Sequence, residues 1–416
     1  MSSKIIPATT VILMSLCFNY CANAQTKSIT IDEAITIALQ NNGTIKADSL
    51  EIEGAKSLKK TAHELPKLNL NTQLGQYNSI NIDNAFQLSQ TIPFPTLFGA
   101  KKAFITATIK GKEYQKEISI IELKNQVRTY YYQIQYLQHN KIKLLYLDSV
   151  YLEFIRVANL RFKTGDIKKI EISTAETKQG EINLLLQQNE VYLYNAYNSL
   201  QLLLNTKEKY SLTITDKFEP LQVSVVLDST AVAKHPMILA LYQNAKIAAQ
   251  NKKVEKAQGL PDFTLGYNNQ SLIGIQTINN QEKYFGAANR FSVVNIGIAI
   301  PLTYGATKAK IKALDYQKQA LTETAIQQQK LVEVQLQNAL QQYQQDVKLY
   351  NYYKTQALNN ATDIVNAAQL GYKTGEINYV EYLYALQIAT DVSLKYLQAI
   401  QQINSTVIAI NNIINN

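Results

Sequence analysis

The residue types that most often carry out chemistry are few in this 416-residue chain and lie far apart. Its three histidines, His63, His139 and His235, fall in separate segments and lack the H-x-x-x-H and H-E-x-x-H spacings of metal sites. Both cysteines, Cys17 and Cys21, lie in the N-terminal leader. No P-loop, nucleophile-elbow or dinucleotide-binding motif occurs. The sequence therefore predicts a protein that is not an enzyme and that holds no metal ion or other cofactor.

Residues 1–24 have the pattern of a secretory signal peptide. Lys4 precedes a short apolar stretch, and an Ala-Asn-Ala sequence predicts cleavage before Gln25. Cys21 leaves lipid attachment as an alternative, although the bulky Tyr20 before it does not resemble the usual lipoprotein signal. Because the mature chain then has no cysteine, it can form no disulfide. The leader indicates an exported protein.

A short glycine motif occurs twice, as RFKTGDI at residues 161–167 and as GYKTGEI at residues 371–377. Each copy ends one helical pattern and precedes another, and glycine is the residue that most often ends a helix in the left-handed conformation. A glutamate follows each glycine by six residues, Glu171 after Gly165 and Glu381 after Gly375. The motif predicts two helix-turn-helix tips, at residues 163–167 and 373–377, and suggests an internal duplication.

The helical pattern before each tip is very long. The first runs from about Gly99 to Lys163 without a proline, which at 1.5 Å per residue predicts a helix on the order of 95 Å. The helices after the tips are only a little over half as long, because their patterns end near Leu204 and Asn412. We therefore expect each to stack end to end with the N-terminal helix of its own half, as in a coiled-coil-like assembly.

Two segments alternate apolar and polar residues with the period of a β-strand. They span residues 67–93 and 262–301, and each predicts a hairpin of strands about ten residues long joined by a polar loop. Strands of this length can cross a membrane in a β-barrel. Four strands cannot close a barrel, so three copies with 12 strands would be needed. Two soluble hairpins that cap a coiled coil are the alternative.

The order of these patterns predicts the domain organisation. Residues 25–205 form a first repeat, residues 206–228 a linker with some strand, and residues 229–416 a second repeat. Spacing supports the duplication, since Lys163 comes 70 residues after Pro93 and Lys373 comes 72 after Pro301. The net charge of +9 comes from lysines spread along the helices, without the dense basic patch of a nucleic-acid-binding protein.

The tips FKTG and YKTG, the strand ends Ile92-Pro93 and Ile300-Pro301 and the two-fold repeat resemble the TolC family of outer-membrane efflux proteins. The resemblance covers nearly the whole mature chain. It implies a mainly α-helical fold, with duplicated long helical hairpins and four transmembrane strands per chain. Three chains would form a 12-stranded β-barrel on an α-helical barrel that extends into the periplasm. Residues 65–67 and 75–79 resemble, more weakly, the subgroup that serves heavy-metal cation pumps.

The resemblance also implies roles for residues at the tips. Glu171 and Glu381 match acids that ring the pore, and Tyr372 matches an aromatic residue involved in closure. The positions that match the adaptor-docking tip are Phe162, Gly165, Tyr372 and Gly375. A further family acid falls on Tyr384, which puts a double acidic ring in doubt. The alternative for both glutamates is a solvated helix position, with Glu171 paired to Lys168 across one helix turn.

By this resemblance the chain is expected to be the passive exit duct of a tripartite efflux system. Its partners would be two further copies of itself, a periplasmic adaptor protein, an inner-membrane pump of the resistance-nodulation-division type and outer-membrane lipid. Either small molecules or metal cations would pass through it. A channel for secreted protein and a periplasmic coiled-coil scaffold or adaptor are the alternatives.

Overall fold

The computed structural model describes residues 27–76, 79–212, 218–223, 230–302 and 304–414. The predicted signal peptide and parts of the predicted linker lie outside these residues. The chain divides into two compact units. The strand unit comprises Thr44–Ser119 and Leu227–Gln335, and the tip unit comprises Met1–Gly43, Ile120–Val226 and Leu336–Asn416. Each unit thus contains segments of both sequence repeats.

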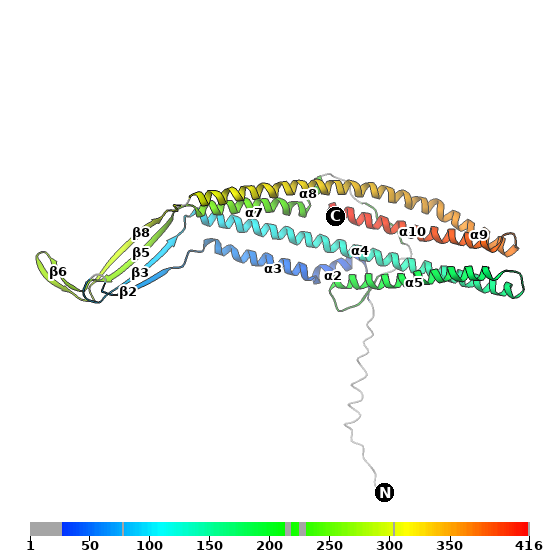
Figure 1. Cartoon of the computed structure of the whole chain (residues 1–416), viewed down its shortest axis with the longest axis horizontal. Helices are drawn as coiled ribbons and strands as arrows, with labels where there is room; N and C mark the ends of the chain where they lie inside the picture. The colour runs from blue at the N-terminus through cyan, green and yellow to red at the C-terminus, as the bar shows by residue number, and fades with distance from the viewer. Residues whose placement is uncertain (1–26, 77–78, 213–217, 224–229, 303, 415–416) are drawn as a thin grey trace, which may run out of the picture. The chain divides into compact units, whose positions relative to one another are not determined.

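Helices dominate both units (Figure 1). Long stretches without proline, rich in residues that favour helix, explain their length. The helices are α2 (Ile31–Asn41), α3 (Gly43–Ser57), α4 (Thr96–Lys163), α5 (Lys169–Leu204), α6 (Thr230–Ala233), α7 (Pro236–Gln258), α8 (Tyr304–Tyr352), α9 (Leu358–Thr374) and α10 (Tyr379–Ile414). A 3₁₀ turn, Leu58–His63, follows α3 and ends before Pro66.

A four-stranded antiparallel sheet forms one end of the strand unit, in the order β2 (Asn69–Gly75), β3 (Asp83–Ile92), β5 (Asp262–Ser271) and β8 (Arg290–Ala299) (Figure 1). The two predicted hairpins join side by side through β3 and β5, in a register that pairs Leu88 with Tyr267 and Ile92 with Phe263. Within the described residues β2 and β8 each pair on one side only. Both outer edges of the sheet therefore carry unpaired backbone groups.

The register separates the side chains of this sheet by polarity. One row across all four strands is Leu70, Leu88, Tyr267 and Val294, and paired residues share a face. The neighbouring row on the opposite face is Asn69, Ser89, Gly266 and Asn295. The first face carries exposed apolar side chains, with Leu74 79% and Ile296 81% accessible, although its row Thr72, Phe86, Asn269 and Ser292 is largely polar. The sheet thus has one mainly apolar and one mainly polar face, as its two-residue period predicts.

The segment between β5 and β8 differs from the polar loop expected between the strands of the second hairpin. It forms a hairpin of β6 (Gly274–Ile278) and β7 (Gln281–Phe285). Asn279 and Asn280 form the turn between them with φ angles of 54° and 63°. A two-residue turn with both residues in the left-handed region matches the twist of a hairpin, and asparagine tolerates that region.

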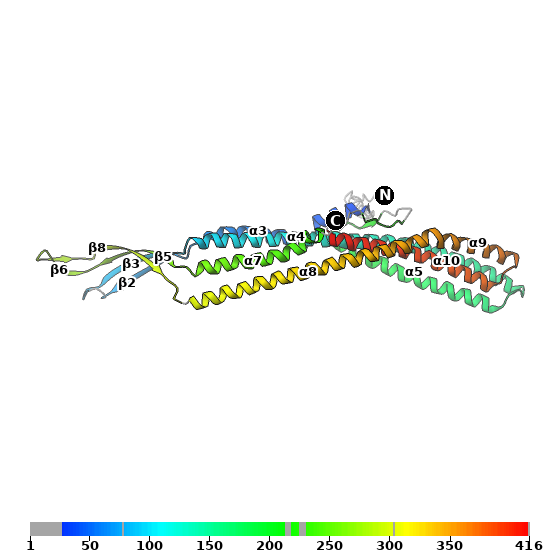
Figure 2. The same cartoon turned by 90° about the horizontal axis from the view of Figure 1, so that it is seen from above.

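In the strand unit α7 lies between α4 and α8 (Figure 2). A Cβ atom on Gly111 of α4 would lie 3.1 Å from the Ile247 side chain, so glycine allows α7 to approach. The Gln243 side chain donates a hydrogen bond of 2.7 Å to the Ala107 carbonyl in the same contact. On the other side of α7, Lys252 and Asp315 of α8 form an ion pair of 2.6 Å.

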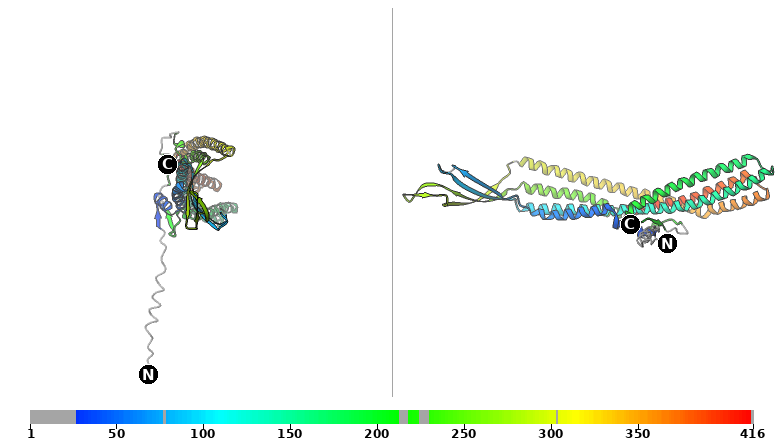
Figure 3. Two further views of the ribbon diagram at one scale, coloured as in Figure 1. Left: turned by 90° about the vertical axis from the view of Figure 1, so that its left-hand side faces the viewer. Right: turned by 90° about the horizontal axis from the view of Figure 1, so that it is seen from below.

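In the tip unit α5 runs alongside the C-terminal part of α4 (Figure 3). Buried Asn189 of α5 donates to the Leu137 carbonyl at 3.0 Å and accepts from the Asn140 side chain at 2.9 Å. The C-terminal end of α5 meets α2, since Asn205 donates to the Asn41 carbonyl at 3.0 Å. Thr30 and Glu33 cap α2 in a capping box.

Two short features complete the tip unit. Strand β1 (Lys27–Ile29) pairs in parallel with β4 (Tyr210–Leu212), which places a strand in the predicted linker. The chain from α8 to α9 passes through one π-helical turn, Tyr353–Ala357. A π turn takes up one extra residue within a helix. The distance from the Ile-Pro strand end to the tip is 70 residues in the first repeat and 72 in the second. The π turn accounts for one of these two extra residues.

Candidate functional site

The first tip is a compact helix end. Gly165 has a φ angle of +82° and lies two residues after the end of α4. Its amide donates to the Phe162 carbonyl at 3.1 Å, and the Asp166 amide donates to the Arg161 carbonyl at 3.0 Å. This pair of bonds is a Schellman motif, which satisfies the last carbonyls of a helix. The Thr164 hydroxyl donates to the Arg161 carbonyl at 2.8 Å and holds the turn further.

The second tip has a similar left-handed turn, but the residues that pack beneath it are different. Gly375 also has a φ angle of +82°, and the Glu376 amide donates to the Gly371 carbonyl at 2.8 Å. Gly371 occupies the position of Arg161 in the first copy. Ile377 packs over it, since a Cβ atom on Gly371 would lie 3.3 Å from the Ile377 side chain. The two tips therefore share their turn and differ in the packing beneath it.

Glu171 and Glu381 lie in the first turn of α5 and α10, where Glu171 is partly buried and Glu381 is exposed. The Glu381 carboxylate accepts from the Asn378 amide at 2.9 Å, and the Glu381 amide donates to the Asn378 side chain at 3.0 Å. The Glu171 carboxylate accepts from the backbone amide of Lys168 at 3.3 Å. Each glutamate thus caps the helix after its tip. Their alignment in a pore stays a prediction.

Tyr372 lies in an aromatic stack that joins α4, α9 and α10. Its ring is parallel to that of Tyr382, with centroids 5.1 Å apart and an angle of 7°. Phe154 lies 5.7 Å from Tyr372 and 5.6 Å from Tyr382. The Arg161 guanidinium lies 4.7 Å from the Tyr372 ring centroid, a cation–π contact. Burial raises the pKa of Tyr382 above its usual value.

This stack distinguishes the two repeats. Phe162, which occupies the position of Tyr372 in the first copy, is 43% exposed, whereas Tyr372 is 8% exposed. Ile172 occupies the position of Tyr382. The sequence pattern did not predict a site role for Phe154, Arg161 or Tyr382, because their contacts join three helices. Tyr384, where the further acid was expected, is exposed.

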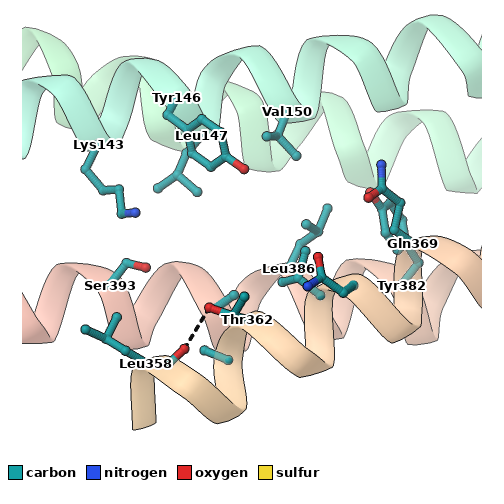
Figure 4. A pocket seen from close by; sticks show the side chains of 14 residues that line it. Lys143, Tyr146, Leu147, Val150, Leu358, Thr362, Gln369, Tyr382, Leu386 and Ser393 are labelled. Atoms are coloured by element: carbon teal, nitrogen blue, oxygen red, sulfur yellow. Dashed lines mark hydrogen bonds between the residues drawn. The ribbon is translucent and has the colours of Figure 1, made fainter. Parts of the chain in front are cut away.

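Two adjacent cavities lie beside the stack within the tip unit. One, of about 250 Å³, lies between α4, α9 and α10, with Lys143 and Tyr146 near one end and Gln369 and Tyr382 near the other (Figure 4). The second, of about 440 Å³, shares Val150, Gln369 and Tyr382 with the first. Its wall also includes Phe154, Val157, Arg161, Tyr372 and Lys373.

The three histidines are not brought together. His63 stacks on Phe98 at 5.9 Å, and His139 stacks on Phe218 at 5.5 Å. His235 caps α7, where its Nδ1 accepts from the Met237 amide at 3.2 Å. Among the described residues no group of three or more histidine, cysteine or acidic side chains is placed to hold a metal ion. In the same part of the chain no helix combines the length and apolar character needed to cross a membrane.

Comparisons with known proteins extend these observations. No family model matches the chain, and no curated protein sequence does. Solved structures do match. CusC, whose structures concern transmembrane channel formation, has a TM-score of 0.76 at 16% identity, covering 96% of this chain and 95% of its own. The outer membrane protein VceC from Vibrio cholerae has a TM-score of 0.75 at 15% identity, covering 93% of this chain and 96% of its own.

A third solved structure is the open state of the MtrE outer membrane channel from Neisseria gonorrhoeae. It has a TM-score of 0.74 at 16% identity and covers 93% of this chain and 89% of its own. The fold is therefore that of these outer-membrane channels, and the mainly helical fold with a small sheet part, predicted from the sequence, is confirmed.

Proposed function

We propose that this chain, which has the fold of outer-membrane channels, is one protomer of a trimeric channel of the TolC family. It would be the exit duct of a tripartite efflux system for small molecules or metal cations. The sheet is the observation that carries the proposal. It exposes a mainly apolar face to one side and a polar face to the other, which suits contact with lipid on the first face and with water on the second.

The unpaired edges of the sheet explain the trimer. Backbone amides and carbonyls at an open edge have no hydrogen-bond partner in lipid, at a cost of several kcal/mol for each group. Pairing β2 of one copy with β8 of the next removes both edges. Three copies give 12 strands, enough to enclose a pore. An outer-membrane location follows from this barrel and from the predicted signal peptide.

The tips supply the entrance and the partner surface in this proposal. Their ordered turns and exposed side chains suit contact with a periplasmic adaptor protein, which would link the channel to an inner-membrane pump of the resistance-nodulation-division type. Glu171 and Glu381 would line the narrow end. Several carboxylates in a narrow ring attract cations and raise one another's pKa. Tyr372 would hold the second tip in its closed form through the aromatic stack.

Electron microscopy and planar-bilayer recording of the purified full chain test the proposal together. Detergent extracts of the membrane fraction should contain three-fold symmetric particles that form stable conducting channels. Ile296→Asn places a polar group on the apolar face of β8, so this variant should insert into the bilayer less well than the natural chain. Asn295→Ser, on the polar face, is the control and should insert normally. Recovery of a monomer from the soluble periplasm without detergent would instead favour a scaffold or adaptor.

A further inference from the structure

The larger cavity of the tip unit has the chemistry of a ligand site. Its volume of about 440 Å³ lies in the range of pockets that hold small organic molecules. Three aromatic rings, those of Phe154, Tyr372 and Tyr382, and the side chain of Val157 line it. Apolar walls of this kind favour a ligand with a flat, apolar body, because ring contacts bury its surface.

Two positively charged side chains also line the cavity. Arg161 lies over the Tyr372 ring and Lys373 follows Tyr372 directly, and both line the cavity. Within the described part of the chain neither cation forms an ion pair. The acid of the cavity, Glu153, is already paired with Arg156 through two hydrogen bonds of 2.7 and 2.8 Å. The net charge that the cavity offers a ligand is therefore positive.

The Arg161 guanidinium is well placed to use this charge. Its central carbon lies 4.7 Å from the Tyr372 ring centroid, and a guanidinium in contact with an aromatic ring can bind an anion through its N–H donors at the same time. The Tyr372 hydroxyl is buried and has no hydrogen-bond partner among the described residues. A buried hydroxyl without a partner is costly, so an anionic oxygen within its reach would relieve that cost.

We propose that this cavity binds small aromatic anions, with the ring system against Phe154 and Tyr382 and the anionic group on Arg161 and Lys373. A ligand there contacts α4, α9 and α10 at once. It would stabilise the arrangement of these helices by mass action, because it binds only when they are packed as described. The inference rests on the tip unit alone and does not depend on the proposed channel function.

A matched pair of fluorescent probes tests the site on the full chain in amphipol. The probes are 8-anilinonaphthalene-1-sulfonate and its neutral analogue N-phenyl-1-naphthylamine, which share the same rings and differ in the sulfonate. We expect the anionic probe to bind at least tenfold more tightly at this site. Replacing Arg161 with Gln should weaken its binding about tenfold or more, since a charge-assisted hydrogen bond is lost. Lys373→Gln should weaken it less.

Control variants separate the cavity from general surface binding. Lys163→Gln removes the same charge from the first tip outside the cavity and should leave the affinity unchanged. Val157→Trp fills the cavity and should abolish the binding of both probes at this site. Because the chain has no tryptophan, the emission of that residue reports whether it is buried. If the Val157→Trp variant does not fold, Val157→Leu is a milder substitution that should weaken the binding of both probes.

The proposal is overturned if Arg161→Gln and Lys163→Gln have equal effects on the anionic probe. It is also overturned if a folded Val157→Trp protein still binds that probe as the natural chain does. These results would leave the channel proposal untouched, because bilayer conductance is measured separately on the same preparations.

Discussion

Gly375 gives a prediction whose magnitude follows from the structure. Its φ angle of +82° lies in the left-handed region, and no heavy atom lies within 4 Å of the Cβ that alanine would add. Gly375→Ala therefore causes no clash, and its cost is the backbone strain of a left-handed L-residue, about 1–2 kcal/mol. Alanine also reduces the entropy of the unfolded chain, which offsets part of this cost. We expect a net destabilisation of the tip of about 1 kcal/mol.

Amide hydrogen exchange of the second tip measures this cost locally. The amides of Glu376 and Ile377 donate to the Gly371 carbonyl at 2.8 and 3.3 Å, so they exchange when the turn opens. A loss of about 1 kcal/mol corresponds to about fivefold faster exchange. Gly375→Asn should have a smaller effect, because asparagine tolerates the left-handed region.

Gly180→Ala is the matched control with the opposite expected sign. Gly180 lies inside α5 with no heavy atom within 4 Å of an added Cβ, and its φ angle is not in the left-handed region. Alanine there should stabilise the helix by about 0.5–1 kcal/mol. If Gly375→Ala leaves exchange at the tip unchanged, the left-handed turn does not form in solution and the reasoning fails. Gly375→Val should further impair efflux while trimers still form, and normal resistance in that variant would count against a docking role.

Three further predictions concern the pore, the tip unit and the sheet. Glu381→Gln keeps the capping box, because glutamine serves at this helix position. It should lower cation selectivity in single-channel records without lowering the melting temperature, and an unchanged record would show that Glu381 does not line the constriction. Burial raises the pKa of Tyr151 to about 12, so the folded state favours the neutral phenol. The stability that the neutral Tyr151 side chain contributes should be complete below about pH 10. It should be lost as the pH rises through the pKa of Tyr151 in the folded protein. Over that pH range the urea unfolding midpoint of the Tyr151→Phe variant should fall less than that of the natural chain. Parallel curves of midpoint against pH would contradict the raised pKa of Tyr151. Ile296→Lys on the apolar face should destabilise the protein in lipid vesicles by about 2–4 kcal/mol, whereas Asn295→Lys on the polar face should cost much less. Equal losses would refute a lipid-facing sheet.

The sequence by itself determined the local elements and their repetition. Left-handed glycines at Gly165 and Gly375 end helices because of backbone sterics, which no distant contact needs to supply. The change in the spacing of apolar residues, from the helical period to every second residue, predicts the strands without any knowledge of how the strands pair. The expected alternation of apolar and polar faces follows directly from that spacing, and the structure places these residues on opposite faces as predicted.

Only the tertiary structure decided what these elements do together. The pairing of β3 with β5 joins residues of different repeats, and its register depends on the sheet as a whole. Phe154 and Arg161 come from α4, Tyr372 from α9 and Tyr382 from α10, so their stack depends on the packing of three helices, which no local pattern encodes. The duplicated tips are similar in sequence and in their left-handed turns, yet only the second contains a buried aromatic pair, because Tyr372 and Tyr382 replace Phe162 and Ile172. Local spacing thus defines the turns, whereas packing between distant helices defines the site that lies beside them.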